Sequence, residues 1–209
     1  KMYGVVKTDA YGHGAVPVAR TIDRFVCGYA VATVDEGLKL RRHGIEKEIL
    51  CLGPVSAGRY QECLENDISL PMFEYRRAKE LSDAAVAEGK TAKIHIAVDT
   101  GMSRIGLFPD EGSVETVKEI AELPALRIAG MFTHFARADE ADKTNAGEQY
   151  RRFHAFCDAG KAAGVEVPVC HCSNSAGIAE IREANMDMVR AGITLYGMWP
   201  SEEVAHNIS

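Results

Sequence analysis

Short β-prone segments alternate with helical segments along nearly the whole chain, and this alternation constrains the fold more than any other feature. The β-prone segments are residues 2–7, 29–33, 48–53, 68–73, 93–99, 127–134, 167–172 and 188–190. Each of the first seven is followed by a stretch with helical character. Gly44, Gly89 and Gly164 stand where helices would end in a left-handed residue. Strands that alternate with helices indicate βαβ units and a parallel sheet.

Eight such strands favour a closed (β/α)₈ TIM-type barrel over an open sheet. The structural alternative is a doubly wound sheet that binds a dinucleotide. Its G-x-G-x-x-G fingerprint does not follow the first strand, where the sequence reads "YGHG". No long linker or low-complexity segment interrupts the series, so residues 1–209 are predicted to form a single domain. The helix after the eighth strand would begin near residues 201–209.

The composition limits the kinds of binding partner and the cellular compartment that we expect. The chain has 24 Lys and Arg against 30 Asp and Glu, a formal charge of −6, which argues against nucleic acid or an anionic membrane surface. No apolar run approaches the roughly 20 residues of a membrane span. Six cysteines without zinc-site spacing indicate reduced thiols and a cytoplasmic protein. In Cys170-His171-Cys172 the histidine would face away from both cysteines on a strand, so no metal site is predicted.

Polar and ionisable residues gather where the predicted strands end. In a barrel of this type the active site is built at the carboxyl ends of the strands and in the loops that follow them. The residues found there, in chain order, are Lys7, Tyr11, Arg104, His134, Asn174, Ser175 and Arg190. We therefore expect these side chains to meet on one rim of the barrel.

Two of these loops have the composition of an anion site. Loops after the seventh and eighth strands commonly hold phosphate in such barrels. "SNSAG" supplies hydroxyls and the start of a helix, and "RAGI" supplies Gly192, where a backbone can approach a ligand closely. A lysine, an anion cup and an arginine together suit pyridoxal 5′-phosphate (PLP), because its aldehyde, its phosphate and its ring nitrogen each need one of them.

Five motifs occur in one order at these strand ends: "VVKTDAYGHG", "DTGMSRIG", "MFTHFA", "CSNSAG" and "MVRAGITLYG". Together they resemble the barrel domain of alanine racemase, over residues 5–197. The resemblance covers nearly the whole chain but only part of that family's protein. We therefore expect this domain to be truncated at both ends, without an N-terminal segment and without the C-terminal β-domain.

The resemblance implies four residues at the reacting end of the cofactor. Lys7 would bind PLP covalently and serve as one of two catalytic bases. Arg190 would face the pyridine nitrogen, where a cation discourages protonation of the ring and leaves a weaker electron sink. His134 would lie against the ring, and Arg104 would lie on its phenolic-oxygen side.

The same resemblance implies a phosphate site. Tyr11 and Ser175 would hydrogen-bond the phosphate, helped by the backbone N–H groups of Gly192 and Ile193. Asn174 is assigned to the cofactor site beside Ser175.

One position departs from the family. Many members carry a lysine two residues before the aspartate of "DTGM", in several of them carbamylated and bracing the arginine. Here the residue is Ala97. Since alanine forms neither a carbamate nor a side-chain hydrogen bond, Arg104 needs another partner or is held less firmly.

The resemblance implies a homodimeric enzyme that interconverts L- and D-alanine and supplies D-alanine for peptidoglycan. Its second base would be a tyrosine from the partner subunit's C-terminal domain. The alternatives are a racemase of serine or another amino acid, a related PLP decarboxylase, a non-catalytic PLP-binding barrel and a lysine Schiff-base aldolase. Arg190 argues against the decarboxylase, which usually places a glutamate at the ring nitrogen. The aldolase leaves Tyr11 and Arg190 unexplained.

Overall fold

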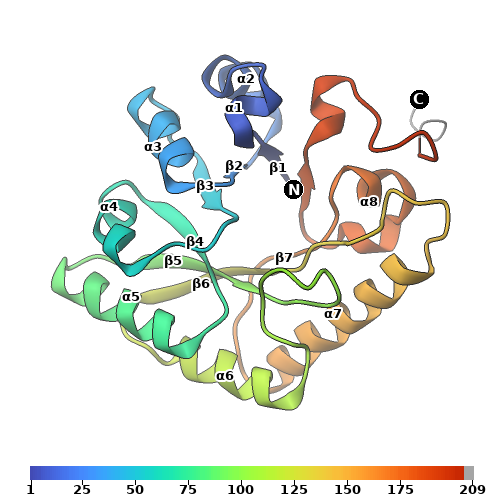
Figure 1. Cartoon of the computed structure of the whole chain (residues 1–209). Coiled ribbons are helices and arrows are strands. Elements are labelled where there is room, and N and C mark those ends of the chain that lie inside the picture. Colours follow the sequence, from blue (N-terminus) through green and yellow to red (C-terminus); the bar gives the residue numbers. More distant parts are fainter. Residues whose placement is uncertain (205–209) are drawn as a thin grey trace.

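The computed structural model describes residues 1–204, and these form a barrel of eight parallel strands (Figure 1). The strands are β1 (Met2–Val5), β2 (Gly28–Val31), β3 (Glu48–Cys51), β4 (Ile68–Met72), β5 (Ala92–Ala97), β6 (Leu126–Phe132), β7 (Cys170–His171) and β8 (Val189–Ala191). Their order in the sheet is β7-β6-β5-β4-β3-β2-β1-β8. The predicted TIM-type barrel is confirmed.

Helices connect the strands and surround them. They are α1 (Lys7–Tyr11), α2 (Ala15–Ile22), α3 (Val34–Arg42), α4 (Tyr60–Glu65), α5 (Tyr75–Ala87), α6 (Glu111–Ala121), α7 (Thr144–Ala162) and α8 (Ser175–Glu180). Short 3-10 turns add η1 (Asp23–Phe25), η2 (Ala57–Arg59), η3 (Arg182–Asn185) and η4 (Ile193–Tyr196). None of the helices in residues 1–204 is both long and apolar enough to span a bilayer.

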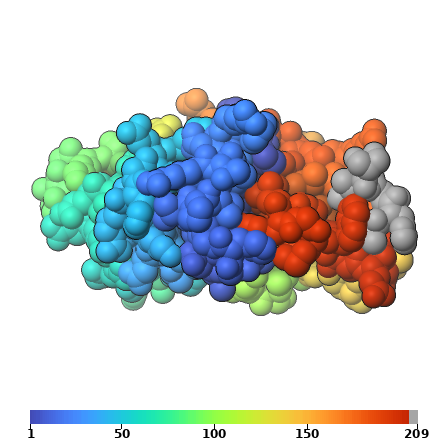
Figure 2. Space-filling view, turned by 90° about the horizontal axis from the view of Figure 1, so that it is seen from above, coloured from blue at the N-terminus to red at the C-terminus, as the bar shows by residue number. Residues whose placement is uncertain are grey.

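The first and the last strand pair with each other in the barrel wall. β8 pairs in parallel with β1, with Tyr3 opposite Arg190. In Figure 2 the N-terminal segment, in blue, therefore lies beside the C-terminal segment of the described chain, in red. Between β7 and β8 the backbones are joined by two isolated hydrogen bonds. Asp187 N–H donates to Cys170 O (3.2 Å), and Arg190 N–H donates to Ser173 O (3.0 Å). The barrel is therefore nearly closed, and most sparsely bonded there.

Apolar side chains form two separate cores. The larger lies between the strands and the surrounding helices and includes Tyr29, Ile94 and Phe153. The smaller is a cluster of Tyr3, Val5, Ala30, Leu50 and Met188. Since side chains alternate across a strand, Ile94 and Ile96 join the outer core while His95 faces the other way.

The first seven observed strands end one or two residues before the predicted ones. The seventh strand was expected over residues 167–172 but spans only Cys170–His171. Pro168 has no N–H to donate to a ladder, so pairing begins after it. The first strand ends at Val5 instead of Lys7, because Lys7 opens the α1 turn. Of the helix expected near residues 201–209, residues 202–204 form a turn, and 205–209 lie outside the described part of the chain.

Candidate functional site

The predicted residues line one hollow at the carboxyl ends of the strands. A cavity of ≈ 320 Å³ is lined by Lys7, Tyr11, His134, Asn174, Ser175, Arg190, Gly192 and Ile193, among others. Arg104 lines an adjoining cavity of ≈ 230 Å³, which shares Lys7, His134 and Arg190 with the first. The larger volume lies within the range typical of small-molecule sites, about 300–1,000 Å³. The structure thus brings together every site residue that the sequence indicated.

Lys7 is presented by a turn of unusual conformation. Four consecutive residues, Thr8 to Tyr11, have φ between 52° and 57°, so α1 turns in the left-handed sense. Left-handed residues other than glycine cost about 1–2 kcal/mol each. No pattern in the sequence predicted this turn. Such strain persists where the surroundings enforce it, and it is characteristic of functional sites.

Neighbouring side chains hold the turn. The carboxylate of Glu36, near the start of α3, accepts the Thr8 N–H at 2.6 Å and the Ala32 N–H at 2.7 Å. Asp9 accepts from the Ala15 N–H and from the Lys39 ammonium, both at 2.8 Å. Asp9 therefore has a structural role.

Arg190 is buried and held by fixed acceptors. Its Nη1 lies 2.6 Å from His171 Nδ1 and donates to His171 O at 3.1 Å. Its Nη2 donates to Thr133 O at 2.7 Å and to Cys172 O at 3.1 Å, and lies 3.4 Å from His134 Nδ1. Within residues 1–204 no hydrogen bond is found at its Nε, which leaves one N–H for a ligand. Burial lowers the pKa of Arg190 to about 10, so it stays charged at neutral pH.

His134 is kept neutral by its surroundings. Burial lowers the pKa of His134 to about 3, and the positive charges of Arg190, Arg104 and Lys7 act in the same direction. A neutral imidazole therefore lies among three cations. Such a concentration of positive charge favours anionic groups such as phosphate and carboxylate.

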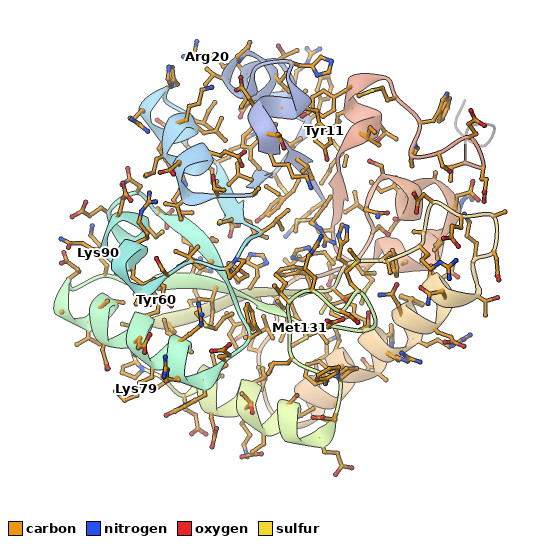
Figure 3. The ribbon with its side chains drawn as sticks, in the orientation of Figure 1. Tyr11, Arg20, Tyr60, Lys79, Lys90 and Met131 are labelled. Atoms are coloured by element: carbon orange, nitrogen blue, oxygen red, sulfur yellow. The ribbon has the colours of Figure 1, made fainter. Side chains whose placement is uncertain are left out.

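The far end of the cavity is built for an anion from hydroxyls and backbone N–H groups. Ser175 Oγ accepts from Gly192 N at 3.0 Å and lies 3.1 Å from Thr194 Oγ1. A methyl group added at Gly192 would lie 2.9 Å from the Tyr11 hydroxyl and 3.6 Å from Ser175 Oγ. In Figure 3, Tyr11 lies between the α1 turn and the segment after β8, and its ring packs on Tyr196, 4.9 Å between centroids.

Asn174 lines the cavity but already has a partner. Its side-chain oxygen accepts the Gly177 N–H at 3.0 Å and caps α8. That bond places the following residue, Ser175, at the first position of the helix. Its assignment to the cofactor site stays a prediction.

Asp99 fixes the backbone around Arg104, not its guanidinium. The carboxylate accepts the N–H groups of Gly101 and Ser103, each at 3.0 Å, and of Arg104 at 3.1 Å. Ala97, where many family members carry lysine, is fully buried. Among the described residues no side-chain hydrogen bond or ion pair holds the Arg104 guanidinium, which is exposed.

The sequence did not indicate two residues that support the site. Tyr196 donates from its hydroxyl to Val5 O at 2.7 Å, and its ring stacks on His13. His171 was expected to face away from its cysteine neighbours, and that side proves to be the one that meets Arg190. The alternation of a histidine between apolar residues was the only available signal. No group of three or more metal-binding side chains occurs in residues 1–204.

Comparison with known proteins agrees with this geometry. The family described as "Alanine racemase, N-terminal domain" matches residues 1–200. The chain is 46% identical to the alanine racemase of Clostridium novyi over 205 residues, which is 98% of this chain and 53% of that protein. It is 42% identical to that of Methanococcus maripaludis, again over 98% of this chain and 55% of the relative.

Solved structures show the same likeness. The alanine racemase of Clostridium difficile 630 superposes with a TM-score of 0.97 at 39% identity, over 99% of this chain and 54% of the other. That of Bacillus anthracis with bound L-Ala-P gives 0.91 at 36% identity, over 98% and 53%. The chain thus spans about half the length of these relatives, and it belongs to the alanine racemase family through the N-terminal barrel domain.

Proposed function

We propose that the protein containing this chain is a PLP-dependent racemase that interconverts L- and D-alanine, and that residues 1–209 belong to its PLP-binding barrel domain. The proposal is supported by one observation, a cavity that is lined both by Lys7, His134 and Arg190 and by Tyr11, Ser175 and Gly192. The reaction is proposed from the family to which the chain belongs.

The residues present fit PLP at both ends. At one end, hydroxyls of Tyr11 and Ser175 and the close approach at Gly192 form a cup that an added Cβ would fill. At the other, Arg190 keeps its Nε–H unused within the described residues. Lys7 also lines this cavity, and its ammonium makes no hydrogen bond or ion pair within residues 1–204. When bound, PLP supplies the electron sink that acidifies the Cα–H of an amino acid.

Each side chain then has a defined task. Lys7 holds the cofactor covalently and moves a proton to and from Cα on one face of the substrate. Arg190, held by five contacts, keeps a positive charge at the ring nitrogen. His134 stays neutral and lies beside Arg190, so it does not add a fourth charge. Arg104, with its guanidinium exposed, is free to orient toward the substrate carboxylate or the ring hydroxyl.

The second base comes from outside this barrel. We assign it to a tyrosine of the C-terminal domain of a partner subunit, which makes the complete protein a homodimer. The proposal further includes a cytoplasmic location and D-alanine supply for peptidoglycan, and both rest on the family resemblance. A racemase of serine or another amino acid, or a PLP-binding barrel without catalysis, is the alternative on the same fold.

The cofactor assignment is tested by mass spectrometry on the full-length protein. Borohydride treatment with PLP should attach the cofactor permanently to the peptide that contains Lys7. The variant Lys7→Arg should lose this label, and Lys79→Arg, at an exposed lysine of α5, should keep it. Label on another lysine, or none with PLP in excess, would reject the proposal. Activity with alanine and with serine, measured side by side, separates the two substrates.

A further inference from the structure

A chain of buried polar side chains crosses the inside of the barrel from the candidate site toward its opposite end. His171 Nδ1 lies 2.6 Å from Arg190 Nη1, and His171 Nε2 lies 3.0 Å from His95 Nδ1. His95 Nε2 lies 3.3 Å from Glu48 Oε1. His95, His171 and Arg190 are no more than 3% exposed. Glu48 is the first residue of β3, so it stands at the amino-terminal end of the barrel.

The chemistry of Arg190 fixes the direction of every bond in this chain. A guanidinium only donates, so His171 Nδ1 must accept and carries no proton. A neutral imidazole then has its proton on Nε2, which donates to His95 Nδ1. His95 in turn is unprotonated at Nδ1 and donates from Nε2 to the Glu48 carboxylate. A proton on His95 Nδ1 would require His171 to accept at both nitrogens, which a neutral imidazole cannot do.

The chain ends on a well-anchored carboxylate. Ser69 Oγ donates to Glu48 Oε1 at 2.8 Å, and the Tyr3 hydroxyl hydrogen-bonds the same group. Burial alone would raise the pKa of Glu48, but the hydrogen bonds of His95, Tyr3 and Ser69 outweigh it and bring the pKa to about 2. Glu48 is therefore ionised at neutral pH. It is the acceptor that terminates a run of donors starting at Arg190.

We propose that Glu48 is a positioning residue for Arg190, acting across the barrel by holding His95 and His171 in the tautomers that present a lone pair to the guanidinium. If the acceptor at position 48 is lost, either the His95 Nε2–H is left unpaired or both histidines change tautomer. In the second case His171 Nδ1–H would oppose the Arg190 N–H, two donors 2.6 Å apart. Either outcome weakens the contact that orients Arg190.

The test is the tautomeric state of the two histidines, read by ¹⁵N solid-state NMR of the full-length protein labelled at histidine and arginine, without PLP. The signals are assigned with His95→Gln and His171→Gln. In the unmodified protein both rings should be protonated at Nε2 only. An Nδ1–H form at His171 in that protein overturns the proposal, whatever the variants of Glu48 do.

In Glu48→Leu, the Nε2–H tautomers of His95 and His171 should be favoured over their Nδ1–H tautomers by about tenfold or less. The NMR signals of the Arg190 guanidinium should shift as well. Glu48→Gln keeps a carbonyl acceptor and should restore the original state. Ser69→Ala removes a neighbour of Glu48 without touching His95 and should leave the tautomers unchanged. Unaltered His171 and Arg190 signals in a folded Glu48→Leu protein would mean that Glu48 only fills space.

An activity measurement adds a second readout, which rests on the proposed function. Glu48→Leu should lower kcat about tenfold with little change in KM, since misplacing a group far from the chemistry by 1 Å can cost about 10²-fold. Glu48→Gln should recover most of it. The NMR result stands without racemase activity, so failure of the proposed function and failure of this inference give different outcomes.

Discussion

The hydroxyl of Tyr196, in η4 after the last strand, donates a hydrogen bond to the carbonyl oxygen of Val5, the last residue of the first strand, at 2.7 Å. This bond joins positions 191 residues apart in the sequence, and it reaches the first strand two residues before Lys7. The same ring packs against Tyr11 and His13. The segment after β8 therefore supports the turn that presents Lys7.

Tyr196→Phe should remove this bond and keep the ring contacts. We expect a loss of about 1 kcal/mol in the free energy of unfolding, the usual contribution of one hydrogen bond. The control is Tyr150→Phe on α7, whose hydroxyl makes no hydrogen bond within residues 1–204. Chemical denaturation of both variants measures the difference. Equal stability of the two would show that the bond to Val5 O contributes nothing.

Thr8→Gly should stabilise the protein. Thr8 is exposed and β-branched with φ 56°, a conformation that glycine adopts without penalty. We expect a gain of up to about 1 kcal/mol. The same substitution at Thr21, in the right-handed helix α2, should lower stability by about 0.5 kcal/mol or more, since glycine is a poorer helix former and the bond to Pro17 O is lost. If both variants are destabilised, relief of left-handed strain is not the dominant effect.

Gly192→Ala should weaken PLP binding. A methyl group at this position would come within 2.9 Å of the Tyr11 hydroxyl. We expect at least a tenfold rise in the Kd for PLP, or about 1.4 kcal/mol, measured by absorbance titration of the apo-protein. Gly147→Ala on α7, where a methyl meets nothing within 4 Å, is the control and should leave the Kd unchanged. An equal Kd for PLP in the two variants would mean that the phosphate does not bind beside Gly192.

Acid should unfold this protein through several groups that act in the same direction, because the pKa values of His134, His171 and Glu48 are all lowered in the folded chain. The folded-state pKa of His134 is about 3, below its ordinary 6.5, so protons bind more tightly to the unfolded chain and stability falls as the pH drops from 6.5 toward 3. The pKa of Glu48 is about 2, below its ordinary 4.5, so its contribution is present above pH 4.5 and is lost as the pH falls toward 2.

His134→Gln should accordingly flatten the dependence of unfolding free energy on pH between 6.5 and 3. His154→Gln, at an exposed histidine of α7, is the control for loss of a surface imidazole. Denaturation midpoints at intervals of about one pH unit provide the measurement. A slope as steep as that of the unmodified protein would show that folding does not lower the pKa of His134.

The isolated 209-residue chain should be nearly inactive in racemisation even when loaded with PLP. Proton delivery on the second face needs a positioned acid, and such groups contribute typically about 10²–10⁴-fold. The full-length protein is the comparison, assayed by conversion of L- to D-alanine. Full-length rates from the isolated chain would place the second base within residues 1–209.

The order of elements and the location of the site were determined by local sequence. Alternation of short β-prone runs with helical runs is a short-range pattern, and parallel strands place their carboxyl ends on one rim whatever their lengths. For that reason the positions of Lys7, His134 and Arg190 at strand ends are enough to assign them to one site. The proposal of PLP as the cofactor rests on family motifs, which are also local patterns.

The tertiary structure decided what local pattern does not encode. The left-handed turn after Lys7 exists because Glu36, in a different βα unit, accepts the Thr8 N–H, and no propensity of Thr8 itself favours it. His95 and Glu48 enter the site's support only because β3, β5, β7 and β8 face a common interior, which juxtaposes side chains 19 to 76 residues apart. Long-range contacts of buried polar groups depend on closure of the barrel, so only the folded chain reveals them.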